Sequence, residues 1–154
     1  KNGTSDYRKD WFVVGDYKKL PNEVGGTNTA LPEEVSDRMK ALLAEYNGKK
    51  EKTFEDILDF HVKFERIHPF KDGNGRVGRM ILNQQLINNG LLPVTFSAKG
   101  KYRQAFRIYD RNKDTSSIVH IIGKAQEEAI SRITQLDISL KKSLDINKGE
   151  QFEW

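Results

Sequence analysis

The sequence predicts a mainly α-helical domain, a compact bundle of helices with one small β-hairpin near its start. Apolar residues recur at helical spacing in five stretches between residues 32 and 140, whereas Trp11–Val14 is a short β-prone run. At 154 residues, with 36% hydrophobic and 31% charged residues, the chain has the size and composition of one globular unit. We therefore expect one domain over residues 1–140, followed by a polar, frayed tail over residues 141–154.

The hairpin is predicted at about residues 11–20. Trp11–Val14 would be its first strand, Gly15-Asp16 its turn, and the stretch from Tyr17 its returning strand. The polar, glycine-containing stretch over residues 22–29 is typical of a loop.

Three outer helices are predicted. One begins at Pro32 and ends at Asn47-Gly48, because proline is favoured in a first helical turn and glycine just after a last one. A short amphipathic helix covers Lys101–Arg111. A long final helix starts with Ser116 or Ser117 as its cap and carries an apolar face.

Two central helices enclose the most informative segment. Thr53–Ile67 begins with a capping threonine and has helical apolar spacing. Pro69 disfavours a helical backbone at the preceding residue, so this helix should end near His68. The next helix covers Arg76–Asn89, with Gly73-Asn74-Gly75 at its start. The segment between the two helices is therefore predicted to be a loop.

This loop carries residues suited to phosphate. Free N–H groups at a helix start, with the positive end of the helix dipole, attract anions, and Gly73 and Gly75 permit close backbone approach. Arg76 and Arg79 share one helical face and can hold successive phosphates. Asp72 is a hard oxygen ligand suited to a magnesium ion that bridges phosphates. The string therefore predicts a polyphosphate site.

His68 stands at the other end of the loop. It titrates near neutral pH and suits a base that takes a proton from a hydroxyl group. Phe70 is expected to anchor the loop to the core. Taken singly, such residues would more simply be structural, but the ordered string favours a functional site. Gly73–Gly78 also matches the pattern G-x-G-x-x-G, yet a helix and His-Pro precede it instead of the strand that a Rossmann site requires.

Charge and composition agree with an anion-binding role. The net charge is +4, and between Arg66 and Arg111 nine Lys and Arg residues stand against Asp72 and Asp110. Nucleic-acid binding is the less favoured explanation, since no zinc-finger, RNP-like or helix-turn-helix pattern stands out.

There is no cysteine, so disulfides and zinc–cysteine sites are excluded. No membrane-spanning run or secretory signal is visible, and we expect a cytoplasmic protein.

The string His-x-Phe-x-Asp-Gly-Asn-Gly-Arg-x-x-Arg over residues 68–79 resembles the signature of the Fic family (filamentation induced by cAMP). Tyr7-Arg8 is similar to the element that opens many Fic cores, with Ser5 in place of the usual glycine. The resemblance runs from about Tyr7 to the long last helix. It implies the Fic fold, with a hairpin flap and the active-site loop between two central helices.

Members of the family usually move AMP from ATP to a hydroxyl side chain of another protein. The resemblance implies that this chain is a protein adenylyltransferase that modifies Ser, Thr or Tyr of a target, and itself, and releases pyrophosphate. ATP would be the co-substrate and Mg²⁺ or Mn²⁺ the cofactor. The implied nucleotide-binding residues are Gly73, Asn74, Gly75, Arg76, Arg79 and Tyr102.

The implied roles follow the motif. His68 would be the base, and Asp72 would hold the metal ion. The Asn74 side chain would assist the backbone amides at the α-phosphate. Arg76 would hold the β-phosphate and Arg79 the γ-phosphate.

The hairpin would be a flap that docks the target through Val13, Val14 and Gly15, because an exposed strand edge can pair with an extended peptide. Many Fic proteins also carry an inhibitory helix, Ser/Thr-x-x-x-Glu-Gly/Asn. This sequence holds no such string, so three alternatives stay open: the helix lies in a segment before Lys1, it belongs to a partner protein, or it does not exist.

Several alternatives stay open. The intact Gly73-Asn74-Gly75 favours AMP transfer over phosphocholine transfer or the kinase-like Doc chemistry, while UMP or GMP donors are compatible with it. A catalytically idle nucleotide-sensing or interaction module would have the same fold. A basic nucleic-acid-binding helical domain is the weakest alternative.

Overall fold

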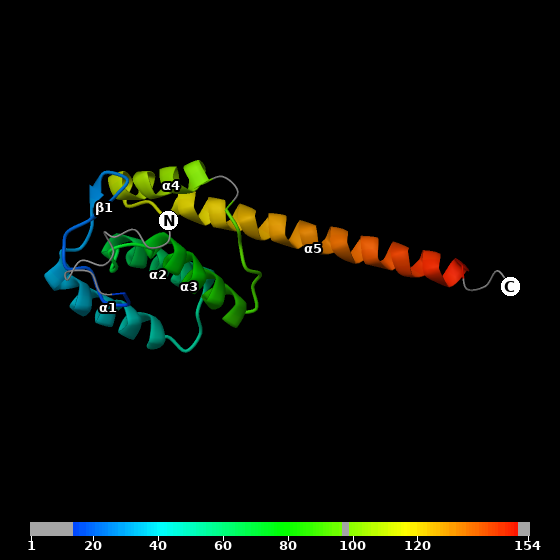
Figure 1. Ribbon diagram of the computed structural model, residues 1–154, viewed down its shortest axis with the longest axis horizontal. Coiled ribbons are helices and arrows are strands. Elements are labelled where there is room, and N and C mark those ends of the chain that lie inside the picture. Colours follow the sequence, from blue (N-terminus) through cyan, green and yellow to red (C-terminus); the bar gives the residue numbers. More distant parts are fainter. Residues whose placement is uncertain (1–13, 97–98, 151–154) are drawn as a thin grey trace.

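The computed structural model describes residues 14–96 and 99–150, and they form a mainly helical domain (Figure 1). The predicted fold class, helices with one small antiparallel sheet, is confirmed. The elements in chain order are β1 (Glu23–Val24), β2 (Thr27–Asn28), α1 (Pro32–Asn47), α2 (Phe54–Ile67), α3 (Asn74–Asn88), α4 (Lys99–Asn112) and α5 (Ser116–Glu150).

The helices are arranged on three levels. In Figure 1, α1 lies at the bottom, α2 and α3 lie in the middle, and α4 with the first part of α5 lies at the top. The rest of α5 extends far beyond the bundle. In the part of the chain that the structure describes, no helix is long and apolar enough to cross a membrane.

Helix α2 is shared by two hydrophobic cores. Its Ile57, Leu58 and Val62 pack with residues of α3, α4 and α5. Its Phe60 and Phe64 pack instead with α1. The residues that α3 to α5 contribute to the first core are Leu82, Leu86, Ala105, Phe106, Ile118, Ile122 and Ala125. Because α2 is buried on both faces, packing on two sides holds its C-terminal end, from which the loop begins.

The predicted boundaries of α2 are confirmed. The Thr53 hydroxyl accepts a hydrogen bond from the Asp56 N–H at 3.2 Å, and the Asp56 carboxylate accepts one from the Thr53 N–H at 2.9 Å. This reciprocal capping box satisfies two donors that a helix start leaves free. The helix ends at Ile67, directly before His68 and Pro69.

The hairpin does not lie where the sequence predicted it. Residues 11–13 fall outside the described residues, and residues 14–20 form turns and bends with no strand among them. The two strands instead flank Gly25 and Gly26, whose φ angles of 60° and 82° suit a two-residue hairpin turn. The glycine pair sets the turn, because glycine adopts positive φ without steric cost.

The predicted frayed tail is also wrong over the residues that the structure describes. Helix α5 passes residue 140 without interruption and ends at Glu150. Its polar composition is compatible with a helix, since pairs of opposite charge four residues apart support it. Lys141 and Asp137 form such a pair at 2.8 Å.

Helices α2 and α3 approach each other closely at Gly78. A Cβ atom added there would lie 2.2 Å from Glu65 Oε1 and 3.2 Å from Phe64 Cδ1. Both neighbours are buried, so neither can move aside freely. The missing side chain at Gly78 therefore sets the distance between the two helices that carry the loop.

The Gly78→Ala variant is expected to lower the free energy of unfolding by about 1–3 kcal/mol, because overpacking outweighs the gain in helix propensity. Gly123→Ala is a matched control on α5, where no described atom lies within 4 Å of the added Cβ atom. This control should raise the free energy of unfolding by up to about 1 kcal/mol. Urea denaturation measures both, and equal stabilisation by the two substitutions would contradict the close approach.

Candidate active site

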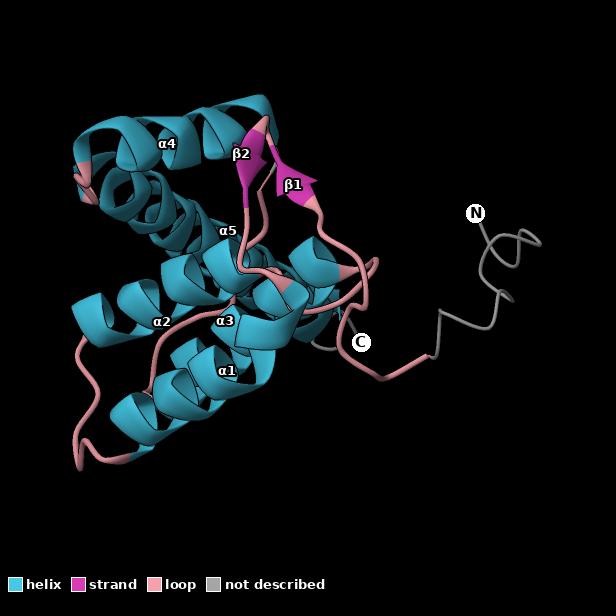
Figure 2. Cartoon of the chain, turned by 90° about the vertical axis from the view of Figure 1, so that its left-hand side faces the viewer, coloured by secondary structure: helices cyan, strands magenta, loops and turns pink. Residues whose placement is uncertain are grey.

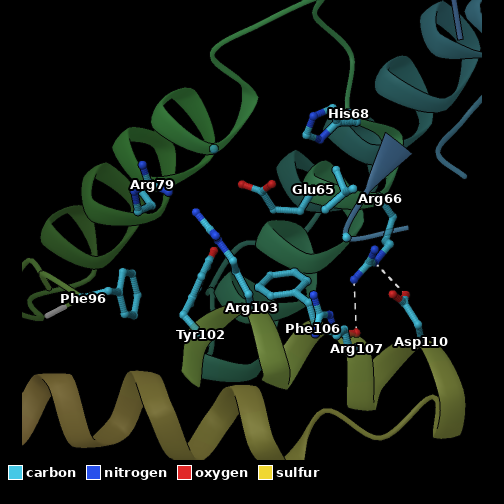
Figure 3. Close-up of a pocket in the computed structure, with 13 residues that line it drawn as sticks. Glu65, Arg66, His68, Arg79, Phe96, Tyr102, Arg103, Phe106, Arg107 and Asp110 are labelled. Carbon is cyan, nitrogen blue, oxygen red and sulfur yellow. Dashed lines mark hydrogen bonds and ion pairs between the residues drawn. The ribbon is translucent and has the colours of Figure 1, made fainter. Parts of the chain in front are cut away.

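A pocket of about 450 Å³ lies among α2, α3, α4 and the hairpin (Figure 3). It brings together four of the predicted site residues: His68, Gly75, Arg79 and Tyr102. The full lining is Val24, Gly25, Glu65, Arg66, His68, Gly75, Arg79, Phe96, Tyr102, Arg103, Phe106, Arg107 and Asp110.

His68 is the C-cap residue of α2, directly after Ile67. Its backbone is left-handed, with φ 50° and ψ 61°. This conformation costs a residue with a side chain about 1–2 kcal/mol, because Cβ approaches the following carbonyl oxygen. Such strain persists where surrounding contacts impose it, and it is common at functional sites. Here it turns the chain from α2 into the loop while the half-buried imidazole faces the pocket.

The environment of His68 favours the neutral imidazole. Burial lowers the pKa of His68 below its usual value of 6.5, and the nearby cations Lys18 and Arg66 lower that pKa further. The Glu65 backbone acts in the opposite direction. A neutral imidazole at physiological pH can accept a proton, as a base must.

The start of α3 has the features of an anion site. Gly73 caps the helix in a left-handed conformation, with φ 81°. The first helical hydrogen bond runs from the Val77 N–H to the Gly73 carbonyl oxygen at 2.9 Å. The N–H groups of the first turn have no carbonyl partner within the helix, and they point toward the positive end of its dipole. The predicted loop-to-helix arrangement is confirmed.

Both motif arginines fold back over the glycines of the loop. A Cβ atom added to Gly75 would lie 3.1 Å from Nη1 of Arg79, and one added to Gly73 would lie 3.4 Å from Nη2 of Arg76. Helical side chains lean toward the N-terminus, which explains the direction. The guanidinium groups therefore add their charge to the amides at the same helix end. Arg79 lines the pocket, whereas Arg76 is exposed outside its lining.

Asn74 has a structural role that the sequence did not reveal. Its side chain is buried, with Oδ1 accepting from Phe70 N–H at 2.8 Å and Nδ2 donating to the Phe70 carbonyl oxygen at 2.7 Å. These two bonds close the loop on itself. The side-chain contact with an α-phosphate that the family resemblance implies stays a prediction, since the amide keeps a second N–H and a second lone pair. Phe70 packs against the α1–α2 core, as expected of a loop anchor.

Asp72 lies at the exposed end of the loop. Its Oδ1 accepts from Gly73 N–H at 2.7 Å, and its Oδ2 lies 3.7 Å from Nη2 of Arg76. Among the residues that the structure describes, no three His, Asp or Glu side chains gather to hold a metal ion. A metal ion at Asp72 would take its remaining ligands from phosphate oxygens and water, which is how Mg²⁺ is usually bound.

Tyr102 lines the pocket, and its hydroxyl group is hydrogen-bonded to Nε2 of His61. Burial lowers the pKa of His61 to about 4 and raises the pKa of Tyr102, so both side chains are neutral at physiological pH. The centroid of the Tyr102 ring lies 4.5 Å from that of the Phe96 ring and 5.0 Å from that of the Phe106 ring. The three rings form an aromatic wall that suits stacking with a base.

Among the predicted docking residues that the structure describes, Val14 and Gly15 do not line this pocket. Val13 lies outside the described residues. Val14 is 85% exposed, and Gly15 occupies a turn with φ 91°. Val24 and Gly25 of the hairpin line the pocket in their place.

Ionic contacts fix the hairpin and α4 around the pocket. Nε of Arg66 lies 2.9 Å from the Asp110 carboxylate, and its Nη2 donates to the Phe106 carbonyl oxygen at 3.2 Å (Figure 3). The Thr27 hydroxyl donates to the same carboxylate at 3.3 Å, and Figure 2 shows the two strands beside α4. Arg66 and Asp110 therefore join α2, α4 and β2 around one opening.

Glu65 is a pocket residue that sequence reasoning missed. It is 7% exposed, and its Oε1 has no hydrogen-bond partner among the described residues. Burial raises the pKa of Glu65 to about 7, against the opposing effect of Arg79 and Arg66. Figure 3 shows its carboxyl group pointing into the pocket. Its spacing, four residues after His61 and three before His68, was the available signal, since it places Glu65 on the helical face of His61 and one turn before His68.

Comparisons with known proteins show the family of this chain. The Fic/DOC family model matches residues 2–86, so the chain belongs to the Fic/DOC family. A probable protein adenylyltransferase of Aquifex aeolicus is 40% identical over 90 residues, covering 56% of this chain and 28% of that protein. A Fido domain-containing protein of Dictyostelium discoideum is 35% identical over 123 residues, covering 72% of this chain and 86% of that protein.

The fold agrees as well. The crystal structure of a Fic domain-containing signaling protein from Bacteroides thetaiotaomicron superposes with a TM-score of 0.64 at 27% identity. The match covers 77% of this chain and 52% of that one. The chain thus spans about a quarter of the Aquifex relative and about half of the Bacteroides structure.

The Glu65→Gln variant should change stability in a pH-dependent way. The pKa of Glu65 in the folded protein, about 7, lies above the ordinary 4.5, so the folded state keeps a proton that the unfolded chain loses. Wild-type stability therefore falls as the pH rises from 4.5 to 7. Glutamine imitates the protonated form, so the variant should exceed the wild type by about 1 kcal/mol at pH 5 and by about 3 kcal/mol at pH 8.

Chemical denaturation of both proteins between pH 5 and 8 measures this difference. His61, whose pKa falls to about 4, acts in the opposite direction as the pH drops below 6.5, but its effect is common to both proteins and cancels. A stability difference that does not vary with pH would show that Glu65 is ionised throughout.

Proposed function

We propose that this chain transfers AMP from ATP to a hydroxyl side chain of a target protein and releases pyrophosphate. One observation carries the proposal. A neutral histidine at the end of one helix and an arginine-lined anion site at the start of the next open on the same pocket. Relatives named as protein adenylyltransferases support the same activity.

The chain's residues divide the work as follows. His68 takes the proton from the acceptor hydroxyl group, whose oxygen then attacks the α-phosphate. The backbone amides at Gly73, Asn74 and Gly75 hold phosphate oxygens. Arg79 holds the terminal phosphate from inside the pocket. Since no covalent enzyme intermediate is needed, the chain contributes position and charge.

Asp72 suits a Mg²⁺ or Mn²⁺ ion shared with the phosphates, and that ion would neutralise charge on the leaving pyrophosphate. Arg76 lies next to Asp72 and would hold the middle phosphate. The aromatic wall of Phe96, Tyr102 and Phe106 would receive the adenine base.

The hairpin at Glu23–Asn28 is the proposed docking element for the target protein, in place of residues 13–15. It borders the pocket through Val24 and Gly25 and is only two strands wide, so its outer edges can pair with an extended peptide. An inhibitory helix from another segment or a partner would act by competing with the terminal phosphate for Arg79.

The His68→Ala variant should lose transfer activity by a factor of about 10²–10⁴ or more, because a general base contributes that much. ATP affinity should stay within about twofold, since the phosphate ligands belong to α3. Transfer of label from ATP to the chain itself and calorimetric ATP titration measure the two effects. His120→Ala, at an exposed histidine of α5, is the control and should leave both unchanged.

The wild-type pH profile offers a second check. Because the pKa of His68 lies below 6.5, activity should be constant from pH 7 to 8 and fall only as the pH drops below that pKa. A His68→Ala variant as active as the wild type would remove His68 from the mechanism. ATP binding without transfer by the wild type would instead favour the idle nucleotide-sensing module.

Asp72→Asn should abolish the dependence of transfer on Mg²⁺ and lower the rate to that of the wild type in excess chelator. Losing the carboxylate removes the hard anionic oxygen that the ion requires. Asp37→Asn, at an exposed position of α1, is the control and should retain full Mg²⁺ dependence. Unimpaired wild-type transfer in excess chelator would contradict the metal assignment.

A further inference from the structure

The segment before α1 crosses the C-terminal end of α2. One residue of this segment, the buried Lys18, is hydrogen-bonded to that end. Lys18 is 3% exposed. Its backbone N–H donates to the Pro69 carbonyl oxygen at 2.7 Å, and its Nζ donates to the Ile67 carbonyl oxygen at 3.1 Å. A single residue thereby binds the carbonyl groups on both sides of His68.

Neighbouring contacts extend this arrangement. Asn22 Nδ2 donates to the Phe70 carbonyl oxygen at 3.0 Å, and Ala30 N–H donates to the Arg66 carbonyl oxygen at 3.3 Å. The carbonyl groups of four residues around His68 are therefore held by one segment that lies far away in the sequence. A helix end leaves such carbonyl groups without partners, so the segment completes the end of α2.

The contacts explain how His68 keeps its backbone conformation. A left-handed φ is disfavoured by its side chain, and a following proline restricts the residue before it to extended conformations. Neither preference is met here, so tertiary contacts must impose the observed geometry. The direction of the imidazole follows from the backbone, because rotamers depend on φ and ψ.

The buried charge of Lys18 is itself informative. Its Nζ also donates to Asn22 Oδ1 and Thr29 Oγ1, both at 2.7 Å, so all three acceptors of the ammonium group are neutral oxygens. Burial and Arg38 lower the pKa of Lys18, and Glu34 raises it. A cation at the C-terminal end of α2 is favoured by the helix dipole, which compensates part of the cost of burial.

We propose that Lys18, supported by Asn22, is a positioning residue that holds His68 in its left-handed conformation and directs its imidazole into the pocket. The inference rests on the proposed role of His68 as the base. Lys18 is more than a structural anchor, because its charge also acts on the base: with burial and Arg66, it keeps the pKa of His68 below the usual value.

The test compares Lys18→Met with Lys19→Met in the full chain. Methionine keeps the length of the lysine side chain but removes its charge and its donors, and Lys19 is an adjacent exposed lysine. In Lys18→Met, kcat for transfer should fall at least tenfold while KM for ATP changes less than twofold, since small displacements of a catalytic group cost rate and the phosphate ligands belong to α3. Lys18→Arg, which keeps the charge, should recover part of the loss. Lys19→Met should behave as the wild type.

A second measurement does not depend on activity. The Hε1 proton signals of the three histidines can be titrated by NMR, and the His68 signal is the one missing from His68→Ala. Its pKa should be higher in Lys18→Met than in the wild type and unchanged in Lys19→Met. If the wild type itself transfers no AMP, the proposed function fails, while this titration still decides whether Lys18 acts on His68.

Folding of the variants is checked by their thermal unfolding. If Lys18→Met does not fold, Asn22→Ala and Lys18→Arg carry the test, with lower kcat at constant KM expected for Asn22→Ala. Unchanged kcat and unchanged His68 titration in a folded Lys18→Met protein would overturn the proposal. A parallel loss of kcat and ATP affinity would also overturn it, since that result would mean a general disturbance of the pocket.

Discussion

The structure depends on how the chain leaves α2 and enters α3. His68 and Gly73 are both left-handed, and these two residues turn the backbone at the two ends of the loop. Asn74 closes the loop, because its Oδ1 accepts from the Phe70 N–H and its Nδ2 donates to the Phe70 carbonyl oxygen. The loop begins from a helix, α2, that contributes residues to both hydrophobic cores. Base and anion site therefore keep a fixed separation before any ligand is present.

Buried polar groups surround this turn. Lys18 completes the end of α2, and Nε2 of His61 pairs with the Tyr102 hydroxyl group while both side chains are neutral. Glu65 has one oxygen that no described residue satisfies, and the same holds for Nδ1 of His61 and Nδ1 of His68. A carboxyl group with a pKa of about 7 is largely protonated below that pH, which reduces its repulsion of a polyphosphate beside Arg79. Strongly shifted groups of this kind cluster at functional sites.

The sequence by itself determined the two central helices, the loop between them and the phosphate-binding string that the loop carries. Helical periodicity, the Thr53 cap and the proline after His68 act between residues close together in the chain, so local physics was sufficient to place α2 and its end. The phosphate-binding string is also contiguous. Its residues lie at the start of α3 because they are neighbours in the sequence. Family membership followed from the same string.

Only the tertiary structure decided what surrounds that string. It placed the hairpin around Gly25, in a stretch that the sequence predicted to be a loop, and it bonded the Asn74 side chain to the Phe70 backbone. It also brought Lys18 to the carbonyl oxygen of Ile67, 49 residues further along, and placed Glu65 against Gly78. These roles arise from burial and from contacts between segments distant in sequence. Periodicity and local spacing carry no information about such contacts, since they depend on how whole helices pack.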